Sequence, residues 1–369
     1  MTFFERRRIQ KTGKDILRYA RHVRSMREDI LAPAELARLG QSTSALRVAL
    51  KSGSADAIEA AGNDLYAHAN RVAPAGRFAG FRENLEILIV AVAVAMAFRA
   101  YFVQPFKIPT GSMQPTLYGI HSTARTEPGL FDRLPLKLVK WLVWGQWYRE
   151  VVVNVPGQLS QPGAAGADSP SVLYYYVGSV RYELPKDAEL NFKGHDYVPA
   201  GSVLWSGVVT AGDHVFVDKV RWNFSRPKRG GIMVFKTDGI AMLMQGTHYI
   251  KRMAGTPGDE INISTPYLIV NGKELMDPEP VAKISRREPP YDKPPYGHGY
   301  IPPILPGTGG HLKTPMEVMR LEEHQYLGLG DNTANSFDGR YWGPVPESNL
   351  VGPACLVYWP FSERWGRAR

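Results

Sequence analysis

The chain has 369 residues, of which 44% are hydrophobic, so it is long enough for two ordinary domains and is not intrinsically disordered. Its net charge of +9 suits an anionic membrane surface, but the Lys and Arg residues follow no zinc-finger or RNA-motif spacing, so no nucleic-acid partner is predicted. The single Cys355 excludes an intrachain disulfide, and the nine dispersed histidines form no HExxH-like pair, so neither a metal nor another cofactor is predicted.

The first 84 residues predict helices. They are rich in Arg, Ala, Leu and Glu, and apolar residues recur at helical spacing through Ile16, Leu17, Tyr19, Ala20 and Val23. No apolar stretch follows the basic residues 6–8, so this is not a cleavable secretory signal. We therefore predict a helical N-terminal region over residues 1–84.

An apolar run is the one candidate for a membrane span. It extends without interruption from Ile87 to Phe98 and continues past Arg99 to Val103. As a helix these residues would span about 26 Å, which is short for a bilayer, and Arg99 could reach the headgroups. We predict a transmembrane helix over residues 85–103, with a buried core helix as the alternative.

Charges around the run predict its orientation. Three basic residues lie just before it and only Lys107 lies close after it; the three are Arg71, Arg77 and Arg82. Because cytoplasmic flanks carry the excess of Lys and Arg, the N-terminal region is expected in the cytoplasm and residues 104–369 outside.

The sequence after Gln104 predicts a mainly β domain. Its β-branched and aromatic runs are Val151–Val155, Val172–Val177, His214–Val220 and Ile232–Phe235. Asn271-Gly272 between two apolar runs predicts a type I′ hairpin. Proline and glycine are dense between Asp277 and Gly310, which predicts a long exposed loop.

Residues 136–148 mix aromatic and basic side chains. Trp141, Trp144, Trp147 and Tyr148 alternate with Lys and Leu residues. This mixture is typical of a membrane interface, and the edge of a hydrophobic core is the other interpretation.

Ser112 stands in a rigid turn. Prolines at positions 105, 109 and 115 keep Gly111-Ser112 out of a helix, which suits exposure of the serine hydroxyl. Taken alone, this is an ordinary turn serine.

The surrounding motif Pro-x-Gly-Ser-Met-x-Pro-Thr-Leu resembles the nucleophile segment of bacterial type I signal peptidases, membrane proteases with a Ser/Lys dyad. Further segments resemble the family's other motifs in the family's order, namely residues 212–219, 226–236, 249–259 and 330–343. The resemblance implies a signal-peptidase-like β-sheet catalytic domain over residues 104–369. It leaves about 90 residues, from Gly119 to Ala211, as a large insertion without a counterpart.

The resemblance also assigns roles to residues. Ser112 would be the nucleophile and Lys251 the general base, which requires a neutral amine and so a lowered pKa. Ser336 would orient the amine, and the Thr110 hydroxyl, where many relatives have serine, would stabilise the oxyanion with the Ser112 N–H. Asp338 and Arg340 would form a supporting ion pair, and Asp331 a turn. The substrate pockets would be lined by Phe106, Ile108, Met113, Leu117, Tyr249 and Ile250.

Such an enzyme would be a serine endopeptidase that removes signal peptides from exported precursors after small residues in an Ala-x-Ala pattern. Its partners would be these precursors and the phospholipid membrane, near the protein export machinery. Its location would be the bacterial inner membrane, with one span and the catalytic domain on the periplasmic side.

Three other functions stay open. One is a Ser/Lys protease dedicated to a single envelope or pilin substrate, and another is an inactive scaffold of the same fold. The third is a Ser/His/Asp hydrolase that uses His195 with Asp196 or His214 with Asp213. Against the third, the chain has no Gly-x-Ser-x-Gly elbow, and adjacent strand residues point to opposite faces.

Overall fold

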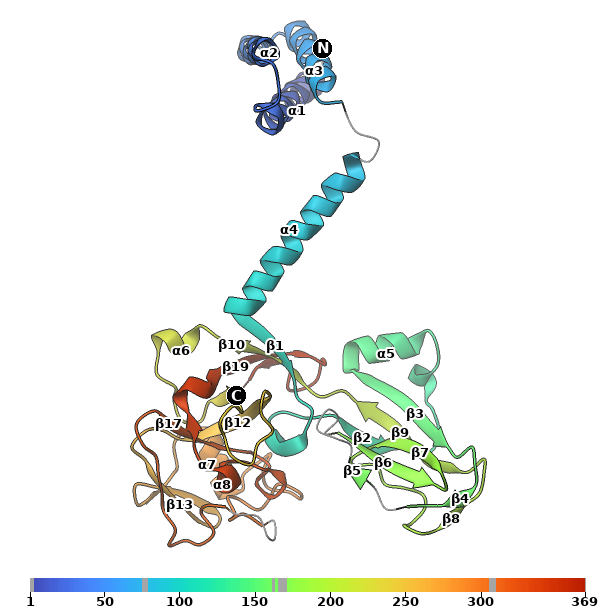
Figure 1. Cartoon of the computed structure of the whole chain (residues 1–369), viewed down its shortest axis with the longest axis vertical. Coiled ribbons are helices and arrows are strands. Elements are labelled where there is room, and N and C mark those ends of the chain that lie inside the picture. Colours follow the sequence, from blue (N-terminus) through green and yellow to red (C-terminus); the bar gives the residue numbers. More distant parts are fainter. Residues whose placement is uncertain (1–2, 75–78, 161–162, 165–170, 305–309, 369) are drawn as a thin grey trace. The chain divides into compact units, whose positions relative to one another are not determined.

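A computed structural model describes residues 3–74, 79–160, 163–164, 171–304 and 310–368 (Figure 1). The chain separates into two compact units, Met1–Val94 and Ala95–Arg369, which are described in turn.

The first unit contains three helices with a common core. Their bounds are α1 Phe3–Arg27, α2 Pro33–Ser52 and α3 Ala55–Val72. Each contributes apolar residues from one face to a buried cluster of Leu17, Ala20, Val23, Leu39, Leu46, Ala49, Ile58, Leu65 and Ala69. Most of the stability of a helix in a protein comes from packing of its apolar face, so this shared core stabilises all three helices.

Helix α4 (Ala79–Tyr101) follows. Its window Asn84–Tyr101 has a mean hydropathy of 1.7 and no buried residue, and within the described ranges it alone is long and apolar enough to cross a membrane. This exposure is evidence against the alternative of a buried core helix. The helix ends two residues before the predicted position 103, because Pro105 lacks an N–H and disfavours helical backbone before it. Arg77, used above for orientation, lies outside the described residues.

The second unit is mainly β, as predicted. Its largest sheet has the antiparallel order β1-β10-β19-β11-β12-β17-β18, with β20 on β19. The strands are β1 Val103–Lys107, β10 His214–Asp218, β11 Ile232–Lys236, β12 His248–Gly255, β17 Gln325–Leu329, β18 Val345–Pro346, β19 Leu350–Trp359 and β20 Gly366–Arg367. β1 is an edge strand, which is where a proline such as Pro105 is tolerated.

Short helices fill the connections of this sheet. They are η1 Gly111–Met113, α6 Arg221–Phe224, η3 Thr333–Asn335, α8 Gly339–Trp342 and η4 Glu347–Asn349. Two of them, η1 and η3, lie beside the sheet at the candidate site described below.

A second sheet has the order β15-β14-β13-β16. Its strands are β13 Glu260–Ser264, β14 Tyr267–Val270, β15 Lys273–Glu274 and β16 Met319–Arg320. The predicted Asn-Gly hairpin is confirmed, since Asn271 and Gly272 join β14 to β15 with φ of 52° and 76°, as a type I′ turn requires.

The predicted exposed loop from Asp277 to Gly310 is wrong in part. Helix α7 (Glu279–Arg286) begins there with a proline in its first turn, which the helix start tolerates. Its apolar residues Val281 and Ile284, three positions apart, are buried in the core beside the second sheet, and so is Tyr291. The density of prolines favoured a loop in the sequence analysis. Burial of the spaced apolar residues stabilises a packed helix instead.

Residues 119–211 form three small sheets with a core of their own. One has the order β2-β9-β3, the second pairs β4 with β8, and the third has the order β5-β6-β7. The strands are β2 His121–Ala124, β3 Gln146–Val152, β4 Gly157–Gln158, β5 Gly163–Ala164, β6 Val172–Val177, β7 Val180–Pro185, β8 Tyr197–Val198 and β9 Val203–Thr210. Helices η2 Leu130–Asp132 and α5 Leu136–Trp144 precede β3. Trp205 is fully buried among the apolar residues of this core.

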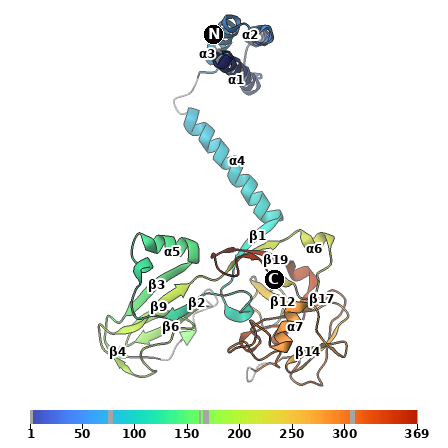
Figure 2. The same ribbon diagram turned by 180° about the vertical axis from the view of Figure 1, so that it is seen from behind.

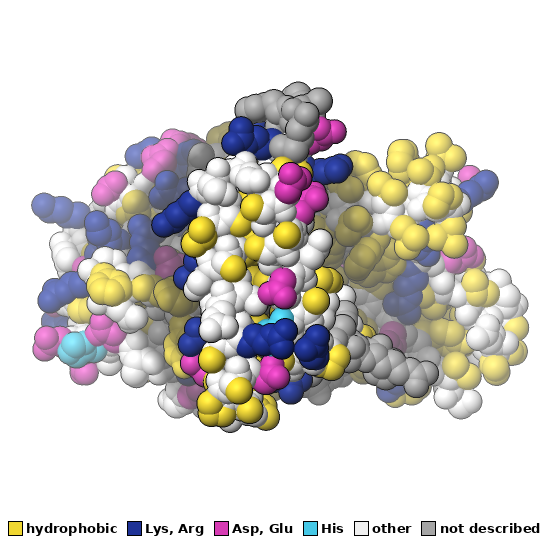
Figure 3. Space-filling view, turned by 90° about the horizontal axis from the view of Figure 1, so that it is seen from above, with side chains coloured by type: hydrophobic (Ala, Val, Ile, Leu, Met, Phe, Trp, Pro, Cys, Tyr) yellow, Lys and Arg dark blue, Asp and Glu magenta, His cyan; other side chains and the backbone are white. Residues whose placement is uncertain are grey.

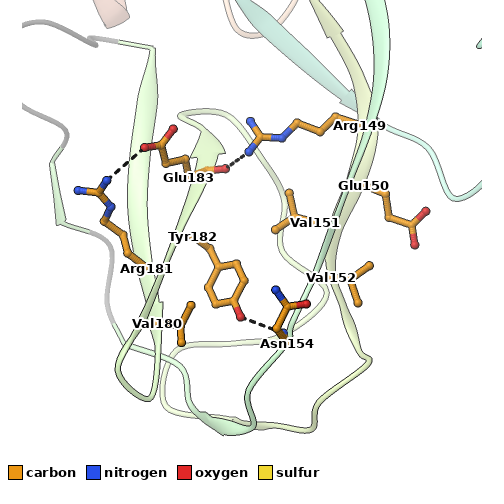
Figure 4. A pocket seen from close by; sticks show the side chains of 9 residues that line it. All are labelled: Arg149, Glu150, Val151, Val152, Asn154, Val180, Arg181, Tyr182 and Glu183. Atoms are coloured by element: carbon orange, nitrogen blue, oxygen red, sulfur yellow. Dashed lines mark hydrogen bonds and ion pairs between the residues drawn. The ribbon is translucent and has the colours of Figure 1, made fainter.

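An open cavity of about 440 Å³ lies between β3 and β7 (Figure 4). Arg149 bridges it by donating to the Glu183 carbonyl at 2.9 Å, and the Asn154 N–H donates to the Tyr182 hydroxyl at 2.9 Å. A second cavity, of about 490 Å³, lies at the end of α5 beside residues 360–364. Neither of these two cavities is lined by a predicted site residue.

Candidate active site

The structure brings Ser112 and Lys251 into contact. They are 139 positions apart, and the Lys251 Nζ donates to the Ser112 Oγ at 2.8 Å. Ser112 lies on η1, just after β1, and Lys251 lies on β12. Their exposed fractions are 8% and 4%. A serine hydroxyl and a lysine amine are thus paired out of bulk water.

The sequence around Ser112 explains its position. Thr110 and Gln114 flank η1 with extended backbone, and Met113 is fully buried in the core, which fixes the turn. Gly119 packs against this turn, because a Cβ there would lie 2.3 Å from the Thr110 carbonyl carbon. Any side chain at position 119 would therefore displace the nucleophile segment.

Burial sets the protonation of Lys251. Removal from water lowers its pKa from 10.5 to about 8, and Arg340 acts in the same direction, while Asp338 and Asp331 oppose the shift. A useful fraction of the amine is then neutral near pH 7. A neutral amine can take the proton of Ser112.

An ion pair lies next to the dyad. Arg252 donates from Nε to Asp331 Oδ1 at 2.7 Å and from Nη2 to Oδ2 at 2.6 Å, and both side chains are almost fully buried. Thr116, which follows the nucleophile, also donates to Asp331, and the Tyr291 hydroxyl lies 3.2 Å from the same carboxylate. Asp331 is therefore more than the predicted turn residue, because it joins three segments of the chain.

Asp338 and Arg340 form a second buried pair. Arg340 donates to Asp338 from Nε at 2.8 Å and from Nη2 at 2.9 Å. Asp338 also accepts the Gly330 N–H at 2.9 Å. Burial alone would raise the pKa of Asp338, but the Arg340 guanidinium and this hydrogen bond hold it below the usual value. The pair is ionised and holds the loop after β17.

That loop touches the nucleophile segment. The Asn332 N–H donates to the Ser112 carbonyl at 3.1 Å, and its side-chain Nδ2 donates to the Gly111 carbonyl at 3.2 Å. Gly330 has no room for a side chain, because a Cβ there would lie 2.5 Å from the Ser112 carbonyl oxygen and 2.1 Å from the Ser336 Oγ. Sequence reasoning gave no role to Asn332, Arg252, Thr116 or Tyr291. Their contacts depend on chain segments that meet only in the fold.

Ser336 and Thr110 lie close to the dyad without contacts that fix their hydroxyls. The Ser336 Oγ is buried and has no hydrogen-bond partner among the described residues. Thr110 is exposed, directly before η1. The structure therefore places both beside Ser112 and leaves their hydroxyls available to other groups.

The predicted pocket residues fall into two sets. Three are in the core, with exposed fractions of 2% or less; they are Ile108, Met113 and Leu117. The other three are partly exposed beside them, namely Phe106, Tyr249 and Ile250. The partly exposed set is the one that a bound peptide could touch directly.

The histidines of the open Ser/His/Asp alternative lie elsewhere. The His214 ring contacts the Gly212 carbonyl, Tyr358 and Trp359. His195 lies in the loop before β8, and its backbone bonds to Leu159. No histidine of the described ranges hydrogen-bonds Ser112, so the alternative has no base at the serine.

The sequence matches a known family over part of its length. Residues 195–359 match the family described as signal peptidase, peptidase S26. This stretch includes Lys251 and Ser336 and leaves out Ser112.

Curated relatives carry the same description. The chain is 31% identical over 165 residues to the probable signal peptidase I-2 of Synechocystis sp., a match that covers 44% of this chain and 62% of that relative. It is 27% identical over 174 residues to signal peptidase I T of Bacillus subtilis, covering 47% and 78%. The first of these matches thus spans less than two thirds of the relative's length.

A solved structure is also similar. A signal peptidase I from Enterococcus faecalis V583 has 25% identity to this chain, with a TM-score of 0.25, and the match covers 35% of this chain and 97% of that one.

Proposed function

We propose, on the premise that this chain belongs to the type I signal peptidase family of peptidase S26, that it is a membrane-bound serine endopeptidase which removes N-terminal signal peptides from exported precursors. The observation that carries the proposal is the buried 2.8 Å contact between the Lys251 amine and the Ser112 hydroxyl. No cofactor is needed for this chemistry.

The reaction follows from that contact. Neutral Lys251 takes the proton of Ser112, and the Oγ attacks the scissile carbonyl to form a tetrahedral oxyanion. The Ser112 N–H and the Thr110 hydroxyl stabilise this oxyanion, a role that typically contributes about 3 to 4 kcal/mol. The ammonium of Lys251 then protonates the leaving amine. Water, deprotonated by the same lysine, hydrolyses the ester and releases the signal peptide.

Support for a membrane location comes from α4. Its exposed apolar window ends at Tyr101, eleven positions before Ser112. So short a connection would hold the active site near the bilayer, where precursors present their cleavage sites. In this proposal residues 1–84 are cytoplasmic, residues 85–103 span the inner membrane and residues 104–369 are periplasmic.

The substrate proposal is tested with the full chain in detergent. We expect cleavage of several unrelated precursors directly after an Ala-x-Ala site, mapped by mass spectrometry of both products. Replacing the alanine before the cut with a bulky residue should stop cleavage at that site. Cleavage of a single precursor from the panel would instead indicate a dedicated processing protease, and intact precursors throughout would contradict the proposal.

The dyad predicts a pH dependence. A lysine base is active when neutral, so kcat/KM should rise with pH and level off above the lowered Lys251 pKa of about 8. The measurement is kcat/KM for a soluble signal-peptide substrate across this range. A rate that falls as pH rises through about 8 would mean that the proton-accepting group is not a lysine.

Ser336 is proposed as a positioning residue for Lys251. Its buried hydroxyl has no hydrogen-bond partner within the described part of the chain, so it is available to the Lys251 amine. Ser336→Ala should lower kcat by about 10² and change KM little, because it disorients the base and leaves the peptide contacts intact. Ser348→Ala, at an exposed position, is the matched control and should match wild type. An equal loss in both variants would exclude this role.

A further inference from the structure

Helix α5 has the reverse of the side-chain pattern expected in water. Its Lys140 is 7% exposed and donates from Nζ to Asp132 Oδ1 at 2.6 Å, and Asp132 is 9% exposed. Leu138 and Leu142, by contrast, are 61% and 64% exposed. A helix on a soluble surface turns its lysines to solvent and its leucines inward. The outer face of α5 is therefore built for an apolar medium.

The exposed apolar residues form one surface. It consists of Leu134, Leu138, Trp141, Leu142, Trp144 and Phe361, each at least 43% exposed, and we call it the α5 face. Hydrophobic side chains gather over this part of the second unit in Figure 3. Contiguous apolar surface of this kind on a folded domain marks an interaction site.

The charges at the α5 face select the partner. Between Pro128 and Arg149 the one acidic residue is Asp132, which is buried against Lys140. The remaining charges in this stretch are basic, and Arg133 is exposed while Lys137 is half-buried. Beside Phe361 the exposed Glu363 is the one acidic side chain of residues 360–364. Apolar side chains and tryptophans with a cationic rim fit an anionic phospholipid surface. A second copy of the same face would meet like charges.

The α5 face is fixed to the sheet that follows the candidate membrane span. Trp359, at the end of β19, donates from Nε1 to the Leu142 carbonyl at 2.7 Å, and the Phe361 N–H donates to the Val143 carbonyl at 2.9 Å. β19 pairs with β10, and β10 pairs with β1, which directly follows α4. Within the second unit, α5 and the start of β1 lie at the same end in both views (Figures 1 and 2).

We propose that the α5 face docks the second unit onto an anionic phospholipid bilayer, as a contact separate from α4. All of its residues lie outside residues 195–359, the stretch matched by the family; five of them belong to this chain's 119–211 segment, and Phe361 follows β19. The docking orients the second unit on the bilayer, which a single span followed by a strand does not do. The inference rests on the proposed membrane location but not on the protease chemistry.

The test places one fluorescent probe at a time in the full chain. In a Cys355→Ser background, Leu138→Cys, Val92→Cys and Lys273→Cys are each labelled with an environment-sensitive dye and reconstituted in vesicles of phosphatidylglycerol and phosphatidylethanolamine. Val92 lies in α4, and Lys273 is the exposed first residue of β15. Lipids that carry a quencher on the acyl chain should remove most of the emission at position 138 and none at position 273.

The probe at position 138 decides the docking proposal. Water-like, unquenched emission there overturns it, and so does a blue-shifted emission that lipid quenchers leave unchanged, since that result indicates a protein partner. The probe at position 92 reports independently whether α4 is in the bilayer. If lipids quench the probe at position 92 but not the probe at position 138, α4 is in the bilayer and the docking proposal is rejected.

Charge reversal supplies a second readout. Arg133→Glu with Lys137→Glu should reduce quenching at position 138 to the level of the probe at position 273, because both substitutions oppose anionic headgroups. Lys193→Glu is the matched control, since it lies near the opposite end of β9 from α5 and should leave quenching unchanged. Equal quenching at position 138 in the parent protein, the double variant and Lys193→Glu would mean that the basic rim plays no part. That result would contradict the anionic-lipid proposal.

Discussion

Ser112→Ala should lower kcat/KM for a signal-peptide precursor by about 10⁴-fold or more, because it removes the atom that forms the ester with the substrate. The loss should appear without unfolding, since the Ser112 side chain makes one hydrogen bond, to Lys251, in the described structure. Single-turnover kinetics on the purified chain in detergent measure the effect.

Controls separate the chemical role of Ser112 from a structural one. The Ser112→Ala protein should keep the wild-type thermal unfolding temperature and still bind precursor. Ser348→Ala, on the surface, should cleave at the wild-type rate. A folded Ser112→Ala protein with more than a few per cent of wild-type activity would mean that another group is the nucleophile.

Asp331→Ala should have the largest effect on stability, about 3 to 5 kcal/mol of the free energy of unfolding. The substitution takes the carboxylate away from the Arg252 guanidinium, which is 1% exposed, and from the hydroxyls of Thr116 and Tyr291. Burying a charge without its counter-ion is costly because the interior cannot replace its hydration.

An exposed pair provides the matched comparison. Glu288→Ala breaks the contact with Arg286; the side chains of Arg286 and Glu288 are 39% and 41% exposed. This substitution should lower the free energy of unfolding by no more than about 0.5 kcal/mol. Denaturant unfolding of the detergent-solubilised chain gives both values. If Asp331→Ala were as mild as Glu288→Ala, the Arg252 pair would not hold the three segments together.

Local chemistry made parts of the fold predictable. The Asn271-Gly272 turn was readable because few residues adopt two successive positive φ angles. The mainly β character of the second unit followed from its β-branched runs. The helix α7 was missed because composition outweighed the spacing of Val281 and Ile284, and its burial depends on strands that are distant in sequence.

In the candidate site, too, local motifs identified some residues, whereas the contacts between them depend on the fold. Ser112 and Lys251 were identified from local motifs, but their 2.8 Å contact depends on how η1 meets β12. Asn332 lies in the matched segment 330–343, but nothing local predicts its contact with the nucleophile segment, and Tyr291 shows no signal beyond the proline pair before it. For residues 136–148, the exposure of Leu138 and Leu142 is evidence against the core-edge interpretation, and the membrane-interface interpretation stays a prediction.

The central claim is that Lys251 is the base for Ser112, and the most direct measurement is kcat/KM of Lys251→Ala beside wild type between about pH 6 and pH 10. We predict that wild type rises through about pH 8, and that the folded variant is lower by about 10³-fold or more and loses this rise. A folded Lys251→Ala protein with wild-type kcat/KM across the range would contradict the Ser/Lys mechanism.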